Sequence, residues 1–64
     1  MKIYTGWILN IEGTEYEITG SMTIRKNTSY TLKRDDKKVS IRREALIEGL
    51  HDGSIKYIGH VAQS

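Results

Sequence analysis

Apolar and polar residues alternate along most of the chain in short stretches, the pattern of β-strands that bury one face. The first stretch covers residues 2–11, where every second position from Ile3 to Ile11 suits the same sheet face. Tyr4 and Ile8 fall on the opposite face. Because both faces are partly apolar, we expect a long central strand that is covered on both sides.

Four further stretches follow the same period, with turn-forming residues between them. We expect strands at residues 14–19, 22–26, 29–34 and 37–41. Their predicted inward residues are Tyr16, Ile18, Met22, Ile24, Tyr30, Leu32, Val39 and Ile41. Turns are predicted at residues 10–13, 27–28 and 35–36, and Gly20-Ser21 is predicted to break or bend the sheet.

After residue 40 the period becomes helical. An apolar stripe at helical spacing consists of Leu46, Ile47 and Leu50. We therefore expect a short helix near residues 42–50, with Ser40 as its N-cap and Gly49 or Gly53 as its C-cap. A last strand is expected at residues 55–61.

The predicted fold class is therefore α+β: a small antiparallel β-meander of five to six strands with one short helix. The meander either closes as an SH3-like or OB-like barrel or remains an open sheet. A length of 64 residues allows one domain, residues 1–64, with a small core. The chain has no cysteine, so no disulfide supplements that core. A homodimer would add burial and is one expectation.

The chain offers no membrane-spanning helix. Its longest aliphatic run is Ala45-Leu46-Ile47, whereas a span needs about 20 apolar residues. The N-terminal residues lack the apolar centre of an export signal. We therefore expect a cytoplasmic protein without membrane contact.

The formal net charge of +2 conceals an uneven distribution of charge. Residues 25–43, the basic segment, contain eight of the ten Lys and Arg residues: Arg25, Lys26, Lys33, Arg34, Lys37, Lys38, Arg42 and Arg43. Such asymmetry bears on partners rather than on the fold. Paired strands would place three of these cations, Arg25, Lys33 and Lys38, on one face among Thr23, Thr31 and Ser40.

Cations and hydroxyls together can contact phosphate oxygens. Alternatively, the basic segment is simply a solvated face that protects the sheet edge from aggregation. The acidic pair Asp35-Asp36 counts against a continuous phosphate track.

Arg42 and Arg43 are predicted to lie in the first helical turn, where acidic residues are normally favoured. This placement indicates an anion site for a phosphate or for a partner's carboxylate. In the alternative, one arginine pairs with Glu15 or Glu17 and the other is solvated. Tyr4 is opposite in phase to Trp7 and is the candidate for an exposed aromatic contact.

Catalysis has little support in the sequence. His51 and His60 are the only histidines, and neither belongs to a metal-ligand or catalytic motif. We therefore expect no enzyme activity, no catalytic residue, no cofactor and no metal.

Two functions remain. The favoured hypothesis is a small protein-binding module, an inhibitor or regulator of the bacteriophage or mobile-element type, that docks on an acidic surface of a host protein. The alternative is a nucleic-acid-binding module that uses residues 25–43 for backbone contacts. The modest net charge and the acidic flanks favour protein binding.

Overall fold

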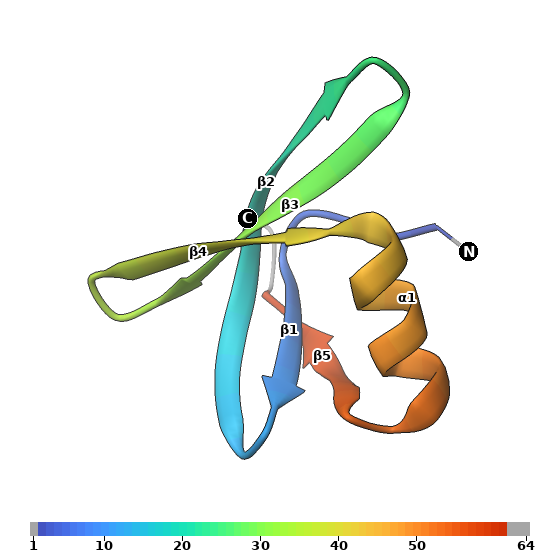
Figure 1. Ribbon diagram of the computed structural model, residues 1–64. Helices are drawn as coiled ribbons and strands as arrows, with labels where there is room; N and C mark the ends of the chain where they lie inside the picture. Colours follow the sequence, from blue (N-terminus) through green and yellow to red (C-terminus); the bar gives the residue numbers. More distant parts are fainter. Residues whose placement is uncertain (1, 62–64) are drawn as a thin grey trace.

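The computed structural model describes residues 2–61 and contains one antiparallel sheet and one helix (Figure 1). In chain order the elements are β1 Trp7–Ile11, β2 Thr14–Ile24, β3 Asn27–Arg34, β4 Lys37–Arg42, α1 Arg43–Asp52 and β5 Ile55–His60. The strand order in the sheet is β4-β3-β2-β1-β5. The predicted α+β meander is confirmed in its open-sheet form, because the edge strands β4 and β5 do not pair to close a barrel.

Two-residue loops connect the first four strands, so β1 to β4 form consecutive hairpins. The Asn10 carboxamide oxygen accepts a hydrogen bond from the Gly13 N–H at 3.0 Å and so stabilises the first turn. This turn and the one at Asp35-Asp36 lie where the sequence predicts them. The three hairpin ends point in different directions because the sheet is strongly twisted (Figure 1).

The first strand is shorter than predicted. It begins at Trp7 rather than at residue 2, because Gly6 adopts a left-handed conformation with φ of 98° immediately before it. The Gly6 N–H still donates to the Ile18 carbonyl at 2.7 Å, which holds the preceding segment beside β2. β1 lies inside the sheet as expected, although α1 covers only one of its faces.

Of the two outcomes predicted at Gly20-Ser21, the break is wrong, because β2 continues from Thr14 to Ile24, whereas the irregularity is present as a shift of register between Ile18 and Gly20. The following turn consists of Arg25 and Lys26 rather than of residues 27–28. Ile24 pairs with Asn27, so only two residues remain for the loop.

A β-bulge in β2 changes which side chains face the core. Ile18 pairs with Leu32, but the next paired residue is Gly20, opposite Thr31, so Thr19 is an extra residue. Beyond this point the alternation of faces is shifted by one position. Met22 and Ile24 therefore lie on the face opposite to Ile18, and the prediction that they point inward is wrong.

The core lies between the sheet and α1. Its buried residues are Leu9, Ile18, Tyr30, Leu32, Leu46 and Ile55. We call the side of the sheet that α1 covers the helix face and the other side the open face. Val39 is on the helix face but is 46% exposed, so its predicted burial is also wrong. It lies near the end of the β3–β4 hairpin, where α1 no longer covers the sheet (Figure 1).

The helix begins later than predicted. Ser40 is part of β4 and pairs with Thr31, so it cannot be the N-cap. Arg42 occupies that position in an extended conformation and provides no side-chain cap hydrogen bond. Gly53 is the C-cap, with φ of 92°, and its N–H donates to the Gly49 carbonyl at 3.0 Å. Within residues 2–61 no helix is long and apolar enough to cross a membrane.

Candidate docking groove on the open face

Strand register places residues of the open face in rows that cross the sheet. One row consists of Ile8, Glu17, Lys33 and Lys38. The next row towards the β2–β3 turn consists of Gly20, Thr31 and Ser40, and a third consists of Met22, Ser29 and Arg42. Directly opposite residues share a face, so each row is a set of neighbouring side chains.

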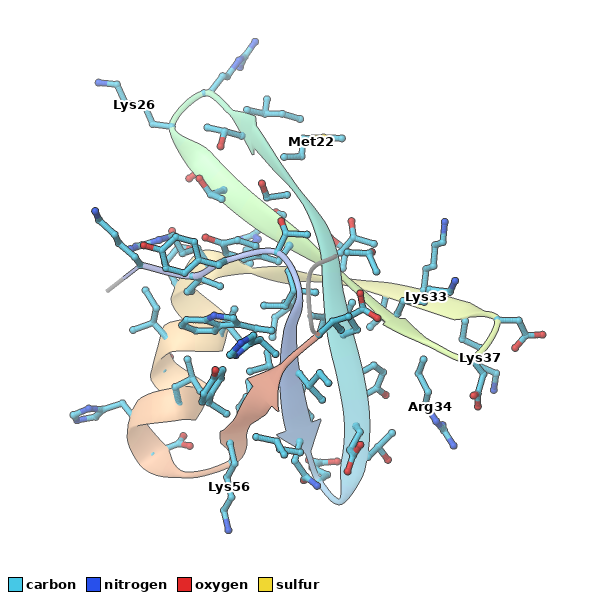
Figure 2. All side chains as sticks on the ribbon, turned by 180° about the vertical axis from the view of Figure 1, so that it is seen from behind. Met22, Lys26, Lys33, Arg34, Lys37 and Lys56 are labelled. Carbon is cyan, nitrogen blue, oxygen red and sulfur yellow. The ribbon has the colours of Figure 1, made fainter. Side chains whose placement is uncertain are left out.

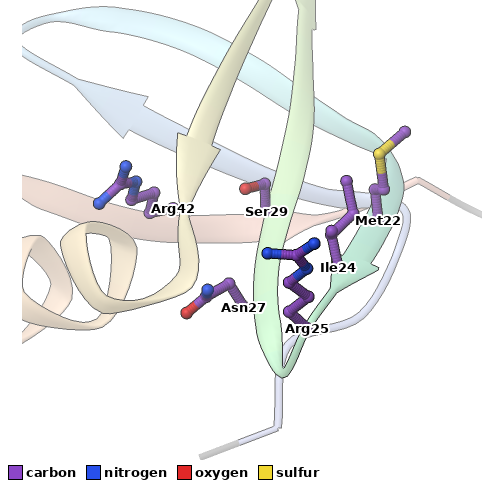
Figure 3. Close-up of a pocket in the computed structure, with 6 residues that line it drawn as sticks. All are labelled: Met22, Ile24, Arg25, Asn27, Ser29 and Arg42. Carbon is purple, nitrogen blue, oxygen red and sulfur yellow. The ribbon is translucent and has the colours of Figure 1, made fainter.

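The third row is part of a shallow groove of about 300 Å³ (Figure 3). We call it the hairpin groove, and its lining residues are Met22, Ile24, Arg25, Asn27, Ser29 and Arg42. They come from β2, β3, β4 and the turn between β2 and β3. The groove contains two cations, two polar side chains and two apolar side chains, and no acidic residue lines it.

The apolar residues of the groove are unusually open to solvent. Met22 is 63% exposed and Ile24 is 60% exposed, the highest values among the exposed large hydrophobic residues of the described chain. They are two positions apart on β2, so both project from the open face. Exposed apolar side chains beside polar ones are characteristic of interaction sites.

The turn that carries Arg25 has an unfavourable backbone conformation. Arg25 and Lys26 have φ of 49° and 68°, so both lie in the left-handed region. A two-residue hairpin loop with two positive φ values favours Asn-Gly, whereas long cationic residues are strained there. Backbone strain of this kind is often retained at functional sites. The Arg25 side chain extends from the turn back along the hairpin, on the side of Ile24 (Figure 3).

The other predicted cations do not form one continuous surface. Lys33 and Lys38 lie opposite each other on the open face, in the row that also contains Glu17. Arg34 and Lys37 are paired on the other face, at the end of the β3–β4 hairpin. Figure 2 shows Lys26 at one hairpin end and this group at another, while Arg42 and Arg43 lie at the start of α1, so the basic segment is divided among three parts of the molecule.

Three further sequence predictions are modified by the structure. Arg25 lies in a turn, so it does not share a strand face with Lys33 and Lys38. Thr23 pairs with Thr28 on the helix-face side, so it does not interleave with those cations. Of the two helix-start arginines only Arg43 is in the first turn, together with Glu44, and Arg43 is partly buried.

Tyr4 is 56% exposed and precedes β1, so it is not part of the sheet. Its ring centroid is 6.0 Å from that of Trp7, and Trp7 is 4.9 Å from Tyr57 on β5. The Tyr57 hydroxyl lies 3.2 Å from Nδ1 of His60. Tyr4 therefore belongs to an aromatic cluster with Trp7 on β1 and Tyr57 on β5.

The loop after α1 begins beside Asp52, whose carboxyl group has a lowered pKa. The Ser54 N–H donates to the Asp52 carboxylate at 2.8 Å. This bond, together with one from the Ser54 side chain, lowers the pKa of Asp52 below its ordinary value of 3.8. These hydrogen bonds stabilise the loop, and the Asp52 carboxylate is exposed rather than placed in a cleft. Among residues 2–61, no cluster of three or more His, Asp or Glu side chains could hold a metal ion.

Sequence reasoning missed four of the six groove residues: Met22, Ile24, Asn27 and Ser29. The alternation predicts the first two as core residues and places Asn27 in a turn and Ser29 in a strand, with no function indicated for either. The composition does not reveal a bulge, so the only available signal was Gly20, a residue that commonly marks one. Protein-family models, curated proteins and solved structures contain no match to this chain.

Proposed function

We propose that this protein is a small protein-binding module that docks on an acidic surface of its partner through the hairpin groove. The proposal includes a non-enzymatic, cytoplasmic role as an inhibitor or regulator of the phage or mobile-element type. It rests on one observation, the exposure of Met22 and Ile24 in a groove that Arg25 and Arg42 also line.

The chemistry of the groove suits a protein partner. Met and Arg are enriched at the centres of protein interfaces, where apolar anchors are combined with charge-assisted hydrogen bonds. Burial of both apolar side chains by a partner would be favourable by about 25 cal/mol for each Å² removed from water. The two arginines would orient an acidic partner and raise its association rate.

Affinity capture from cells that carry the gene tests this proposal. Wild-type protein is compared with Ile24→Ser, and Val61→Ser serves as the control because Val61 is also apolar and exposed, at 40%. We expect the same protein to be captured by wild type and by Val61→Ser, to be lost with Ile24→Ser, and to survive nuclease treatment. Equal capture by all three proteins would contradict the proposal.

A nucleic-acid-binding module is the second candidate. It is favoured by Lys33 and Lys38, which face each other on the open face beside the hydroxyl row of Thr31 and Ser40. Binding of this kind would weaken steeply as salt is raised, because phosphate contacts release counterions. A mobility-shift titration at low salt checks it: a shift that Lys33→Gln and Lys38→Gln remove supports this candidate, and no shift eliminates it.

A further inference from the structure

β4 is an edge strand with a free side. Within residues 2–61 it pairs with β3 alone, and the four residues from Lys37 to Ser40 are all exposed. Alternate residues of such a strand direct their backbone N–H and C=O groups away from the sheet, where another strand can pair with them. The side of β4 that faces away from β3 is therefore a backbone docking edge.

The charge of β4 determines which strand can bind there. Its cations are Lys37, Lys38 and Arg42, and it contains no acidic residue. Pairing of β4 with the same strand of a second copy would bring like charges together, which is unfavourable. The other edge strand, β5, carries Lys56 and His60 and also lacks an acidic residue. An acidic strand from a different protein is the complementary occupant.

The register specifies the pattern of that strand. A residue placed beside Arg42 on the open face extends the row of Met22 and Ser29, next to the hairpin groove. Carboxylates are therefore favoured beside Arg42 and beside Lys38, four positions apart. On the helix face, the residue beside Val39 meets a side chain that is 46% exposed and is best apolar.

We propose that β4 accepts an extended acidic segment of the partner as a sixth strand. The segment carries carboxylates at two positions four residues apart and apolar residues between them on the opposite face. This inference rests on the proposed protein-binding function and specifies how the partner is held. Backbone pairing provides affinity, and the alternating side chains provide specificity.

A synthetic peptide, Thr-Glu-Val-Thr-Val-Glu-Thr, tests the proposal because its side-chain pattern is the same in both strand directions. Its binding to the ¹⁵N-labelled protein is followed by NMR up to millimolar peptide. We expect shift changes along β4 and slower hydrogen exchange of its outward amides. The control peptide has the same composition in another order, Thr-Val-Val-Thr-Glu-Glu-Thr, so its two glutamates are adjacent and lie on opposite faces. It should bind about tenfold more weakly.

N-methylated peptides separate strand pairing from side-chain docking. Two versions carry N-methyl groups on alternate sets of residues, and only one set faces β4 in a paired strand. We expect one version to lose binding and the other to retain it. Equal binding by both versions would overturn the added strand, as would the absence of any shift at millimolar peptide.

Charge-reversed proteins provide the matched comparison. Lys38→Glu should lower the affinity for the peptide by about tenfold, whereas Lys56→Glu changes an exposed lysine on the opposite edge and should leave binding unchanged.

The two proposals can fail separately. If the peptide pairs with β4 but Ile24→Ser retains the cellular partner, the added strand stands and the groove proposal fails. If Ile24→Ser loses the partner but neither N-methylated version is impaired, the groove stands and the added strand fails.

Discussion

Arg25 and Lys26 have the same unfavourable backbone conformation, but their side chains are placed differently. Arg25 lines the hairpin groove, whereas Lys26 does not. A left-handed conformation costs an L-residue roughly 1–2 kcal/mol, and glycine avoids this cost. The turn therefore contains one strained residue that the proposed docking uses and one that it does not use.

Lys26→Gly should stabilise the protein by about 1 kcal/mol, because glycine adopts a positive φ without a steric penalty. The free energy of unfolding from urea titration measures the change. Lys38→Gly is the matched control, since Lys38 lies in an extended strand where glycine is destabilising. A loss of stability in Lys26→Gly would show that the left-handed backbone is not a source of strain.

Asp52 makes a second residue-scale prediction, about pH. The hydrogen bonds from Ser54 stabilise the carboxylate and lower the pKa of Asp52. Their contribution to stability is complete above the ordinary pKa of 3.8 and is lost as pH falls through the lower value of the folded protein. An NMR titration of the Asp52 side chain should give a midpoint below 3.8, and Ser54→Ala should raise that midpoint.

At the scale of the elements, α1 and β5 approach each other closely at Gly49. Gly49 is buried in the helix, and a Cβ atom placed on it would lie 2.6 Å from Cγ1 of Ile55 and 3.2 Å from its Cβ. Ile55 is itself 5% exposed and has little space to move. Gly49 is therefore required by the close approach of helix and strand, although glycine is normally a poor helix former.

Gly49→Ala should destabilise the protein, because the steric conflict with Ile55 outweighs the gain of about 1 kcal/mol in helix propensity. The loss should be smaller when Ile55→Val removes the terminal methyl group. A double-mutant cycle of unfolding free energies measures this coupling. Additive effects of the two substitutions would contradict direct packing between these residues.

The sequence predicts where the strands and the helix lie better than it predicts which of their side chains face the core. Period-two alternation identifies the strands, and the stripe around Leu46 identifies the helix, because both patterns reflect local burial. The extra residue Thr19 leaves no such pattern, yet it reverses the orientation of Met22 and Ile24. The sequence therefore does not predict the groove, although charge indicates Arg25, and charge together with the predicted helix start indicates Arg42.

At the scale of the whole molecule, the small core limits stability. Within residues 2–61 six buried hydrophobic residues form it, and four of them, including Leu46, are almost completely inaccessible to solvent. Average stability per residue implies roughly 3–10 kcal/mol for a chain of this length. Truncation of one core side chain would therefore remove a large part of the free energy of unfolding.

Leu46→Ala should cost about 2–5 kcal/mol, since it leaves a cavity between α1 and the sheet. Thermal unfolding followed by circular dichroism should show Tm lowered by about 4–8 °C for each kcal/mol lost. Val39→Ala, at an exposed position, should change the stability by less than about 0.5 kcal/mol. Similar Tm values for both variants would show that α1 does not complete the core.

The sheet also joins its first and last strands in chain order, because Trp7 pairs with His60 and Ile11 pairs with Ile55 across β1 and β5. The hairpins from β1 to β4 need only local contacts, whereas β5 must find β1 after the whole intervening chain has been made. During synthesis on the ribosome, the nascent protein would therefore expose the edge of β1 until β5 has emerged. Correct folding then depends on β5 reaching that edge before a neighbouring nascent chain does.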